Sequence, residues 1–451
     1  MACIKQVCGY IPFLRLKGDD IKKDVKVPIP SQKAVASYDE NQVTLAYECA
    51  KEIVDSMVND GIGSDGNIAL LFASSSFSDS EKNPAVFISE ALDLPESTIT
   101  LNITGGNNAF VDAVYVASTL VDSGKVKYAI VVSGEKRRSD DWKLDFGFSD
   151  SGGAVLVAPD TEKEFIFKIK EFYFISEETF DTYRKNGKVL TTDERFVAQE
   201  EYLAILKKLS GINVKRFYVS VPTYGISQVI LKQLKIKDDV FQSFGNLGNS
   251  YIPILLAYST GFLDPMEDIV IISFGTGLKG LRLVFSGGKS SYDKILAKFE
   301  RKRLISFADY IRIKDVEGFP EDESSVPMLW REKKQNIRFY GQKCSDCGGV
   351  IFPMQNYCIV CGSKNLKLEK LPKRGEIFTF TEDYLTVYSE IFPPVPMLVV
   401  QLENGARVYV QGTDVDPKDR FKIGDKVELT LRILNSYGGM LNYFYKARKA
   451  G

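Results

Sequence analysis

The chain has 451 residues, of which 44% are hydrophobic and 26% are charged. This length exceeds that of an ordinary single domain, so we expect two to four domains with large buried cores. The 58 basic and 59 acidic residues leave a net charge of −1, which provides no overall attraction to nucleic acids or anionic membranes. The sequence contains no histidine. The protein therefore cannot use any mechanism that needs an imidazole side chain.

Apolar runs and cysteines indicate the compartment. No apolar run reaches the roughly 18 residues of a membrane span, and the first residues lack the apolar core of a signal peptide. Four of the seven cysteines form a metal-ligand pattern. The other three, Cys3, Cys8 and Cys49, are an odd number, which favours reduced thiols over disulfides. We therefore predict a cytoplasmic protein without a membrane partner.

Buried strands and amphipathic helices alternate through the first third of the chain. The segment Ser37–Glu40 matches a capping box, which predicts the start of a helix whose apolar residues continue to Met57. The other predicted elements are a strand and loop at 4–16, strands at 67–73, 98–103, 127–133 and 152–157, and helices at 85–94 and 108–122. Strands this apolar are typical of a sheet that is covered on both faces.

A second stretch repeats this plan. We predict helices at 195–209, 226–234 and 251–262 and strands at 216–221, 268–274 and 278–285. Both stretches end in a strand, a glycine-rich turn and a strand, which indicates an internal duplication with halves at residues 1–160 and 161–290. Residues 286–330 are charged and predicted to be irregular, and we assign 291–330 as a linker that contains the acidic segment Glu321–Ser325.

Two Cys-x-x-Cys pairs follow the linker, Cys344 with Cys347 and Cys358 with Cys361. The two-residue spacing lets both thiolates of a pair face one ion. Four soft ligands select a tetrahedral Zn²⁺, with iron as the lesser option. Because four cysteines leave no open coordination position, we predict a structural zinc ribbon at residues 331–371 rather than a catalytic metal.

The last part of the chain reads as a small β-barrel. Five short strands are predicted at 377–380, 397–402, 406–411, 426–434 and 441–447, which suits an OB-type barrel at residues 372–451. From residue 331 onward the chain carries 19 basic and 13 acidic residues. A ribbon joined to such a barrel also occurs in nucleic-acid-binding proteins, but the aromatic residues suit a barrel core equally well, so nucleic acid is a remote alternative.

Two sets of short motifs lie along the chain in a fixed order. The first set comprises Gly9–Pro12, Val35–Glu40, the Gly105-Gly106 turn, Ser149–Ala154 and Gly245–Leu247, and the second comprises Trp330, Gly341–Cys344, Phe352-Pro353, Arg374–Glu376 and Gln411–Asp414. The first set resembles archaeal-type hydroxymethylglutaryl-CoA synthases of the thiolase superfamily. The second resembles the zinc-ribbon/OB-fold proteins that accompany thiolase-like acyl-CoA enzymes. The resemblance implies an α/β fold: a duplicated thiolase-like α/β/α/β/α domain, then a four-cysteine zinc ribbon and a small OB-type β-barrel.

The resemblance also assigns catalytic positions. At three of them this chain has a residue that cannot do what the family's residue does. The family's thioester-forming Cys falls at Ile103, its acid/base Glu at Ser75, and its His at Val221. The Asn of the family's Gly-Asn turn is retained as Asn246. Because loss of a covalent nucleophile lowers a rate by about 10⁶-fold, acyl transfer through a Cys thioester is effectively excluded for this chain.

Two functions in acyl-CoA chemistry remain open. In the first, the chain is a degenerate component of a C–C bond forming or cleaving complex and works with a catalytic thiolase-like partner, or as a homodimer. In the second, it is a self-sufficient, non-covalent acyl-CoA aldolase or lyase. There, Tyr224, Asn246 and the backbone N–H groups of Gly105, Gly106 and Asn107 would act on the CoA thioester, with Tyr251 as a weaker candidate. We favour the first, since three catalytic positions are lost together.

Overall fold

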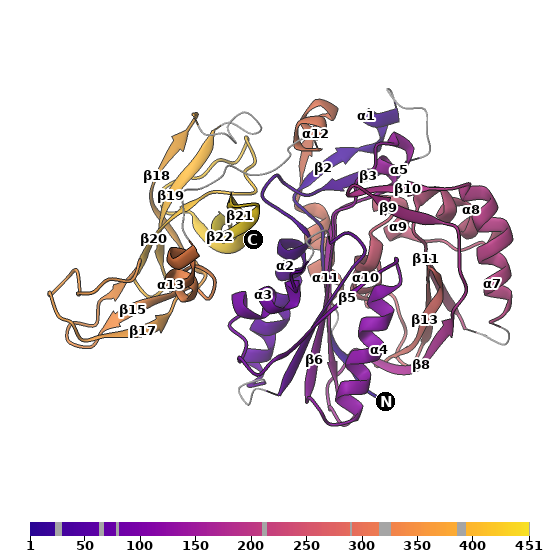
Figure 1. The fold of residues 1–451 in the computed structure, drawn as a ribbon, viewed down its shortest axis with the longest axis horizontal. Coiled ribbons are helices and arrows are strands. Elements are labelled where there is room, and N and C mark those ends of the chain that lie inside the picture. Colours follow the sequence, from indigo (N-terminus) through magenta and orange to yellow (C-terminus); the bar gives the residue numbers. More distant parts are fainter. Residues whose placement is uncertain are drawn as a thin grey trace. The chain divides into compact units, whose positions relative to one another are not determined.

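The computed structural model describes residues 1–22, 29–62, 67–77, 81–209, 214–288, 291–314, 326–385 and 394–450. These residues form two compact units, Met1–Tyr310 and Ile311–Gly451 (Figure 1). The boundary between the units lies inside the segment that the sequence assigns as a linker. Each unit is described by itself.

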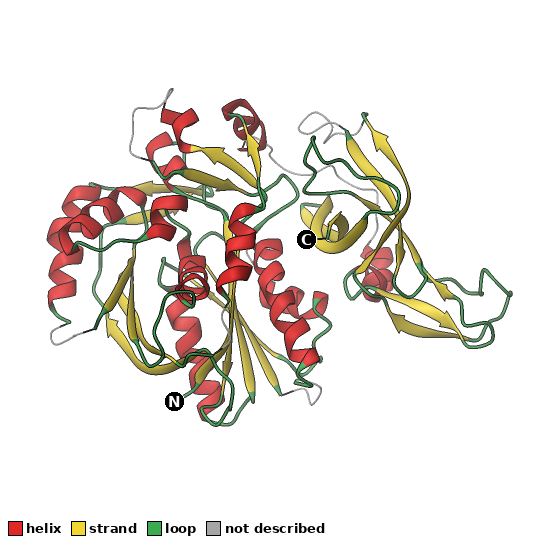
Figure 2. Cartoon of the chain, turned by 180° about the vertical axis from the view of Figure 1, so that it is seen from behind, coloured by secondary structure: helices red, strands yellow, loops and turns green. Residues whose placement is uncertain are grey.

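A nine-stranded sheet forms the centre of the first unit (Figure 2). β4 is parallel to both of its neighbours, β5 and β6, whereas β7 is antiparallel to β6 and β1. β11 is parallel to β12, and β13 is antiparallel to β12 and β8. The strands in spatial order are β11 (Arg216–Ser220), β12 (Asp268–Gly275), β13 (Gly277–Phe285), β8 (Phe167–Ile175), β1 (Cys3–Tyr10), β7 (Ser151–Ala158), β6 (Tyr128–Glu135), β4 (Ile68–Ser74) and β5 (Ile99–Thr104).

The two halves of this sheet repeat one arrangement of strands. The series β1-β7-β6-β4 corresponds in order and relative direction to the series β8-β13-β12-β11. The first half has one more strand, β5, for which the described residues of the second half contain no counterpart. The strand order thus shows the predicted duplication, and β5 remains as an edge strand.

Helices cover both faces of the sheet. α4 (Ala109–Asp122) and α10 (Tyr251–Ser259) share one hydrophobic cluster with strands of both halves, among them β4 and β12. In β7, Gly152 faces Leu45 of α2 (Gln42–Asn59), whereas the next residue, Gly153, faces Pro253 of α10. Because consecutive strand residues point to opposite faces, α2 and α10 lie on opposite faces of this half.

The outer face of the second half is covered in the same way. α7 (Leu203–Lys207) and α8 (Tyr224–Leu234) form a separate cluster with β11, β12 and β13. Helices therefore lie outside each half of the sheet and between the two halves. This layering confirms the predicted thiolase-like α/β/α/β/α fold.

Smaller elements complete the first unit. β14 (Arg303–Ile305), β2 (Leu14–Lys17) and β3 (Gln32–Val35) form a three-stranded sheet, and β9 (Thr182–Lys185) pairs with β10 (Lys188–Thr191). The remaining helices are α1 (Gly18–Lys22), α3 (Pro84–Ala91), α5 (Trp142–Gly147), α6 (Glu194–Phe196), the π-helix η1 (Val197–Tyr202), α9 (Asp239–Phe244), the 3₁₀-helix η2 (Gly248–Ser250), α11 (Tyr292–Glu300) and α12 (Phe307–Lys314).

The predicted start of the first long helix is wrong. α2 begins at Gln42, because the Asn41 side chain accepts the backbone N–H groups of Val43 and Thr44 and the Thr44 hydroxyl closes a capping box with Asn41. The Glu40 carboxylate does accept the Ser37 backbone N–H at 2.9 Å. That hydrogen bond closes the turn before the helix. The Ser37–Glu40 pattern therefore forms a turn and does not cap α2.

The expectation of irregular structure at 286–330 is also wrong where the structure describes it. α11, β14 and α12 lie in this segment, and α13 (Val326–Asn336) begins at its end. β14 pairs with β2 from the start of the chain, a partnership that no local pattern reveals. The acidic segment Glu321–Ser325 lies outside the described residues.

The second unit contains a ribbon and a barrel-type sheet. In the ribbon, β15 (Tyr340–Cys344) pairs with β16 (Val350–Ile351) and β17 (Leu366–Lys370), and α13 precedes it. The five predicted strands that follow are confirmed as one antiparallel sheet, ordered β20 (Arg407–Gln411), β19 (Val395–Leu402), β18 (Arg374–Asp383), β21 (Lys426–Tyr437) and β22 (Met440–Lys449). Among the described helices of the chain, none is long and apolar enough to cross a membrane.

Candidate functional site

The carboxyl ends of strands from both halves meet at Asn107, just beyond β5. Asn107 Nδ2 donates to Ser220 Oγ at the end of β11 at 2.9 Å and to the carbonyl oxygen of Phe274 in β12 at 3.2 Å. The Ser273 hydroxyl donates back to the Asn107 carbonyl oxygen at 3.0 Å. In α/β folds ligands bind beyond the carboxyl ends of parallel strands, so this junction is the candidate site.

The Gly105-Gly106 turn brings β5 to the start of α4 against the turn between β12 and β13. A Cβ on Gly275 would lie 3.1 Å from the backbone nitrogen of Asn107, and a Cβ on Gly106 would lie 3.4 Å from the Gly275 Cα. Gly105 has φ of +147°, which side chains rarely allow. Glycines are therefore required where the two turns approach each other.

The backbone N–H groups of this turn are not used within the part of the protein that the structure describes. Gly105 is exposed and Gly106 is half-buried. Within the described part of the chain, the backbone N–H groups of Gly105, Gly106 and Asn107 donate to no protein acceptor. Donors at the start of a helix favour a developing negative charge, so the turn could hold an oxyanion, as the resemblance implies.

Ile103 supplies no chemistry at this position. It lies in β5, opposite Ala73 of β4, and its half-buried side chain packs against the cluster around α4 and α10. An apolar side chain therefore occupies the position that the resemblance assigns to the family's nucleophile, and this assignment stays a prediction.

Glu135, at the end of β6, is the centre of a buried network that the sequence did not reveal. Its carboxylate accepts the Ser75 backbone N–H at 2.8 Å, the Ser75 hydroxyl at 2.9 Å and Asn249 Nδ2 at 2.8 Å. Asn249 Oδ1 in turn accepts the Phe110 N–H of α4 at 2.8 Å, and its Nδ2 lies 3.3 Å from the Gly106 carbonyl oxygen. The network connects the Ser75 position to the glycine turn.

Asn246 is held in place by a buried cation. Its Oδ1 accepts Arg137 Nη1 at 2.7 Å and the Gly248 N–H at 2.9 Å, and its Nδ2 donates to the Val221 carbonyl oxygen. Both polar atoms of this side chain are therefore engaged inside the protein. Arg137 Nη1 also donates to the Pro222 carbonyl oxygen at 2.8 Å, which puts a guanidinium beside Val221, the position that the resemblance assigns to the family's histidine.

The two tyrosine candidates make packing contacts. Tyr224 stacks on Phe241 with ring centroids 4.9 Å apart, and burial raises the pKa of its phenol. The Tyr251 hydroxyl donates to Asp238, and burial together with that carboxylate raises the pKa of Tyr251 well above its usual range. None of these contacts joins either ring to the glycine turn. The catalytic roles of Tyr224 and Asn246 stay predictions.

Sequence reasoning missed Glu135, Arg137 and Asn249. A weak signal was present, because the charged run Glu135–Arg138 directly follows a strand of apolar residues. Polar residues at the carboxyl end of a buried strand are candidates for a site in any α/β fold. Asn249 had no comparable signal, since its partner Glu135 is 114 residues away.

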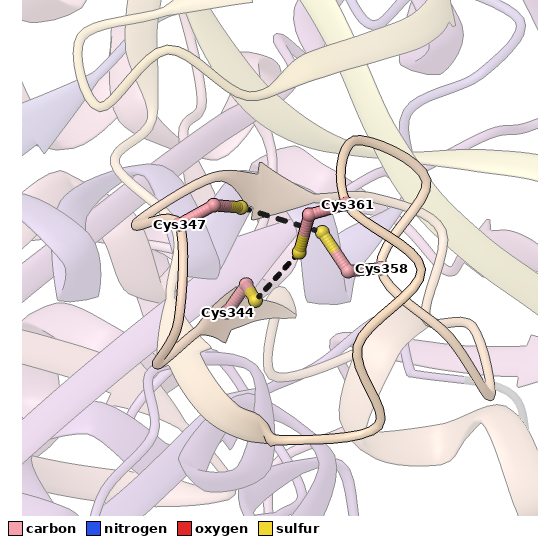
Figure 3. Close-up of side chains that lie close together, drawn as sticks. All are labelled: Cys344, Cys347, Cys358 and Cys361. Carbon is pink, nitrogen blue, oxygen red and sulfur yellow. Dashed lines mark hydrogen bonds between the residues drawn. The ribbon is translucent and has the colours of Figure 1, made fainter.

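The four ribbon cysteines converge as the sequence predicts (Figure 3). Cys344 Sγ lies 3.7 Å from Cys361 Sγ, Cys347 Sγ lies 3.6 Å from Cys358 Sγ, and all four sulfurs are within 4.8 Å of one another. A tetrahedral ion with Zn–S bonds of about 2.3 Å places its sulfurs roughly 3.8 Å apart, whereas a disulfide needs about 2.05 Å. The cluster fits one tetrahedral metal ion.

Both halves of the cluster are built by the same turn. The Gly348 N–H donates to the Cys344 carbonyl oxygen and the Gly362 N–H to the Cys358 carbonyl oxygen, each at 2.9 Å. Gly348 and Gly362 also share a φ of +75°. Two equivalent turns thus present two thiols each from opposite sides.

Comparisons of the sequence with known families match two separate families in the C-terminal part of the chain. Residues 331–367 match the family described as ChsH2, rubredoxin-like zinc ribbon domain, and residues 368–432 match ChsH2, C-terminal OB-fold domain. A DUF35 domain-containing scaffold protein of Pyrococcus furiosus is 33% identical over 126 residues, which are 27% of this chain and 91% of that protein. Its counterpart in Methanothermobacter thermautotrophicus is 35% identical over 122 residues, 26% of this chain and 90% of that protein.

The first unit matches proteins that are described as synthases. Residues 101–172 match the family 3-oxoacyl-[acyl-carrier-protein] synthase III. Hydroxymethylglutaryl-CoA synthase of Pyrobaculum aerophilum is 22% identical over 341 residues, 68% of this chain and 95% of that protein. Among solved structures, a hydroxymethylglutaryl-CoA synthase of Bacillus subtilis, PksG, gives a TM-score of 0.57 at 18% identity, with 75% of this chain and 93% of that chain covered.

The fold and the comparisons together define a thiolase-like domain of the hydroxymethylglutaryl-CoA synthase type, joined to a zinc-ribbon domain and an OB-fold domain. Through this C-terminal part, the chain belongs to the family of DUF35 domain-containing proteins.

Proposed function

We propose that this chain is an acyl-CoA-handling component of a C–C bond forming or cleaving complex, and that a catalytic thiolase-like subunit works beside it. The observation that carries the proposal is the apolar Ile103 side chain next to the glycine turn, at the position that the resemblance assigns to the family's nucleophile. By the same resemblance, Ser75 and Val221 take the positions of the family's Glu and His. Covalent acyl transfer in such a complex must then use the thiol of another chain.

The edge strand β5 supports a second thiolase-like chain as the partner. β5 pairs only with β4 among the described strands. Ile99 of β5 and Tyr115 of the adjacent α4 are 38% and 46% exposed, and the Tyr115 ring meets Phe174 of β8 edge-on with centroids 5.1 Å apart. Exposed apolar side chains beside an open strand edge are typical of pairing surfaces.

A structural Zn²⁺ in the ribbon is part of this proposal. The sulfur separations suit it, and the ribbon's own buried cluster comprises only Cys344, Ile351 and Cys358 among the described residues, with Leu366 packed against it. A core this small is usually stabilised by its metal. Reduced thiols that ligate a metal also favour the cytoplasmic location that we predict.

The decisive experiment combines the purified chain with a purified Cys- and His-bearing thiolase-like protein of the same organism. We expect no turnover of CoA thioesters by the chain alone and a complex of defined mass with the partner or with a second copy. Ile99→Lys with Tyr115→Lys should dissociate that complex, because charges would be buried at the edge of β5. Val58→Lys, at a 68% exposed site on α2, is the matched control. Full activity of the isolated chain would contradict the proposal.

A second candidate function is a non-covalent aldolase or lyase reaction. The observation that favours it is that the backbone N–H groups of Gly105, Gly106 and Asn107 donate to no acceptor in the described part of the protein. They could stabilise the enolate of a non-covalent aldolase or lyase reaction on a CoA thioester. Turnover by the isolated chain that is lost in Asn246→Ala or Tyr224→Phe would establish this function and these residues. Unchanged turnover in both variants would remove the two residues from the site.

A further inference from the structure

Two cysteines lie between β1 and α2, outside the candidate site. Gln6 and Cys8 share one face of β1, and Cys49, Glu52 and Ser56 share one face of α2 at helical spacing. Gln6 Nε2 donates to Ser56 Oγ at 2.8 Å, and the Cys8 thiol donates to Glu52 Oε2 at 3.3 Å. The Cys49 thiol is a hydrogen-bond partner of the Cys8 thiol. The packing of α2 on β1 therefore brings the two sulfurs together.

A lysine contacts the Cys8 sulfur from a third element. Lys298 of α11 donates to Cys8 Sγ at 3.3 Å and to the Glu52 carboxylate at 2.6 Å. Although burial opposes it, attraction to Cys8 and Glu52 raises the pKa of Lys298. The thiolate is the nucleophilic form of cysteine, and a neighbouring cation favours it. Lys298 is thus placed to stabilise negative charge on the Cys8 sulfur.

The two thiols differ in their surroundings. Burial and the neighbouring Cys8 thiol raise the pKa of Cys49 well above its usual value, and Cys49 has no exposed surface. Cys8 is 3% exposed and lines a cavity of about 780 Å³ between β1, α2 and α11. So little exposed sulfur admits only a reactant of about the size of water. Such a reactant meets Cys8 first, with Cys49 behind it.

A bound metal does not explain this pair. Within the described ranges of the chain, the four ribbon cysteines are the only group of three or more side chains that could hold a metal ion. Two adjacent thiols without a third ligand are suited to oxidation instead, because a thiol next to an oxidised cysteine can form a disulfide with it.

We propose that Cys8 and Cys49 form a reversible disulfide when a small hydroperoxide, such as hydrogen peroxide, reaches Cys8 through the cavity. The Cys8 sulfur attacks one peroxide oxygen, the O–O bond breaks, and water leaves with the thiol proton, which gives a sulfenic acid. The Cys49 sulfur then attacks the Cys8 sulfur, the S–O bond breaks, and a second water leaves with the Cys49 proton. The two thiols together lose two electrons, and one peroxide is reduced to two waters.

This disulfide would attach α2 covalently to a central strand of the nine-stranded sheet. A cross-link of this kind restricts the unfolded chain, so the oxidised protein should unfold at a higher temperature than the reduced protein. The reaction does not depend on the proposed acyl-CoA function, because it uses neither the glycine turn nor the ribbon.

The test treats the reduced, full-length chain with hydrogen peroxide, then unfolds and alkylates it and analyses its peptides by mass spectrometry. We expect a cross-linked pair of peptides that contain Cys8 and Cys49 and that dithiothreitol separates. Cys49→Ser should leave Cys8 as a sulfenic acid that dimedone traps on unfolding, and Cys8→Ser should leave Cys49 reduced. Cys3→Ser, which removes another buried thiol of β1, is the matched control and should retain the cross-link.

The role of Lys298 is tested by the rate of cross-linking. Lys298→Gln should slow it at least about tenfold, because the donor at the Cys8 sulfur is removed. Lys294→Gln should leave the rate unchanged. Lys294 is the matched control because it also pairs with Glu52, at 3.2 Å, and lines the same cavity. If Lys298→Gln fails to fold, the cysteine variants decide.

Three outcomes would overturn the proposal. In the first, Cys8 and Cys49 stay reduced while the ribbon cysteines are oxidised. In the second, Cys8 is oxidised to a sulfinic or sulfonic acid without a cross-link, which would show that Cys49 cannot reach it. In the third, the oxidised wild type and oxidised Cys49→Ser unfold at the same temperature as their reduced forms and contain no cross-linked peptide.

Discussion

The Glu135 carboxylate accepts both the backbone N–H and the hydroxyl of Ser75, at 2.8 and 2.9 Å. Ser75 stands where the resemblance places the family's acid/base Glu, and the Glu135 carboxylate from the neighbouring strand β6 lies beside it. Glu135 is fully buried, and Asn249 occupies a further acceptor site on it. These hydrogen bonds join the carboxylate to Ser75 after β4 and, through Asn249, to the first residues of α4. Its role here is to hold the start of α4 and the glycine turn in place.

Glu135→Gln should destabilise the first unit by about 1–3 kcal/mol, because an amide donor would then face the donors of Ser75 and Asn249. Urea unfolding of the purified chain measures this loss. Glu300→Gln, at a side chain that is 81% exposed, should leave stability unchanged. Equal stability of the two variants would show that the network contributes little.

Restoring a thiol by Ile103→Cys should not restore acyl transfer. The new thiol lies at the half-exposed end of β5, so it should react with iodoacetamide, whereas Cys3, Cys8 and Cys49 are buried. No acyl-enzyme should accumulate from acetyl-CoA, because neither Ser75 nor Val221 can move a proton. Intact-mass analysis detects both adducts, and Ile99→Cys on the same strand is the control. A stable acetyl adduct at residue 103 would show that the site retains more of its chemistry than we infer.

Removal of zinc should unfold the ribbon and spare the thiolase-like unit. We expect one Zn²⁺ per chain by metal analysis, lost in Cys347→Ser and retained in Cys3→Ser, because only Cys347 lies in the cluster. Proteolysis after chelation should cut within residues 340–370 first. A chain that folds and resists proteolysis without metal would contradict the structural role.

The pair Glu52 and Lys298 should contribute to the dependence of stability on pH. Their charged atoms are 2.6 Å apart, and although burial opposes it, Lys298 lowers the pKa of Glu52 from 4.5 to about 2. A carboxyl whose pKa is lower in the folded state stabilises it above the unfolded pKa and loses this effect as pH falls. The difference in unfolding free energy between the wild type and Glu52→Gln should therefore shrink between about pH 5 and pH 2. A difference that stays constant over this range would exclude the linkage.

Several features of this protein follow from the sequence by itself. The alternation of apolar strands and helices predicts the layered fold, the Cys-x-x-Cys spacing predicts the four-sulfur cluster, and the Gly-Gly pair after a strand predicts the tight turn. Each of these signals is short-range, because a strand, a helix or a metal knuckle is specified by residues a few positions apart. The interpretation of Ile103 as a lost nucleophile comes from the resemblance to a family and stays a prediction.

The interior of the site was decided by tertiary structure alone. Glu135 meets Ser75 across 60 residues, Asn107 meets Ser220 across 113, and Arg137 meets Asn246 across 109. No local pattern encodes such pairs, because they arise where the ends of strands from two halves of a folded sheet converge. Whether a buried charge is satisfied by its neighbours or left for a ligand depends on distances of a few ångströms, and only the folded chain sets those distances.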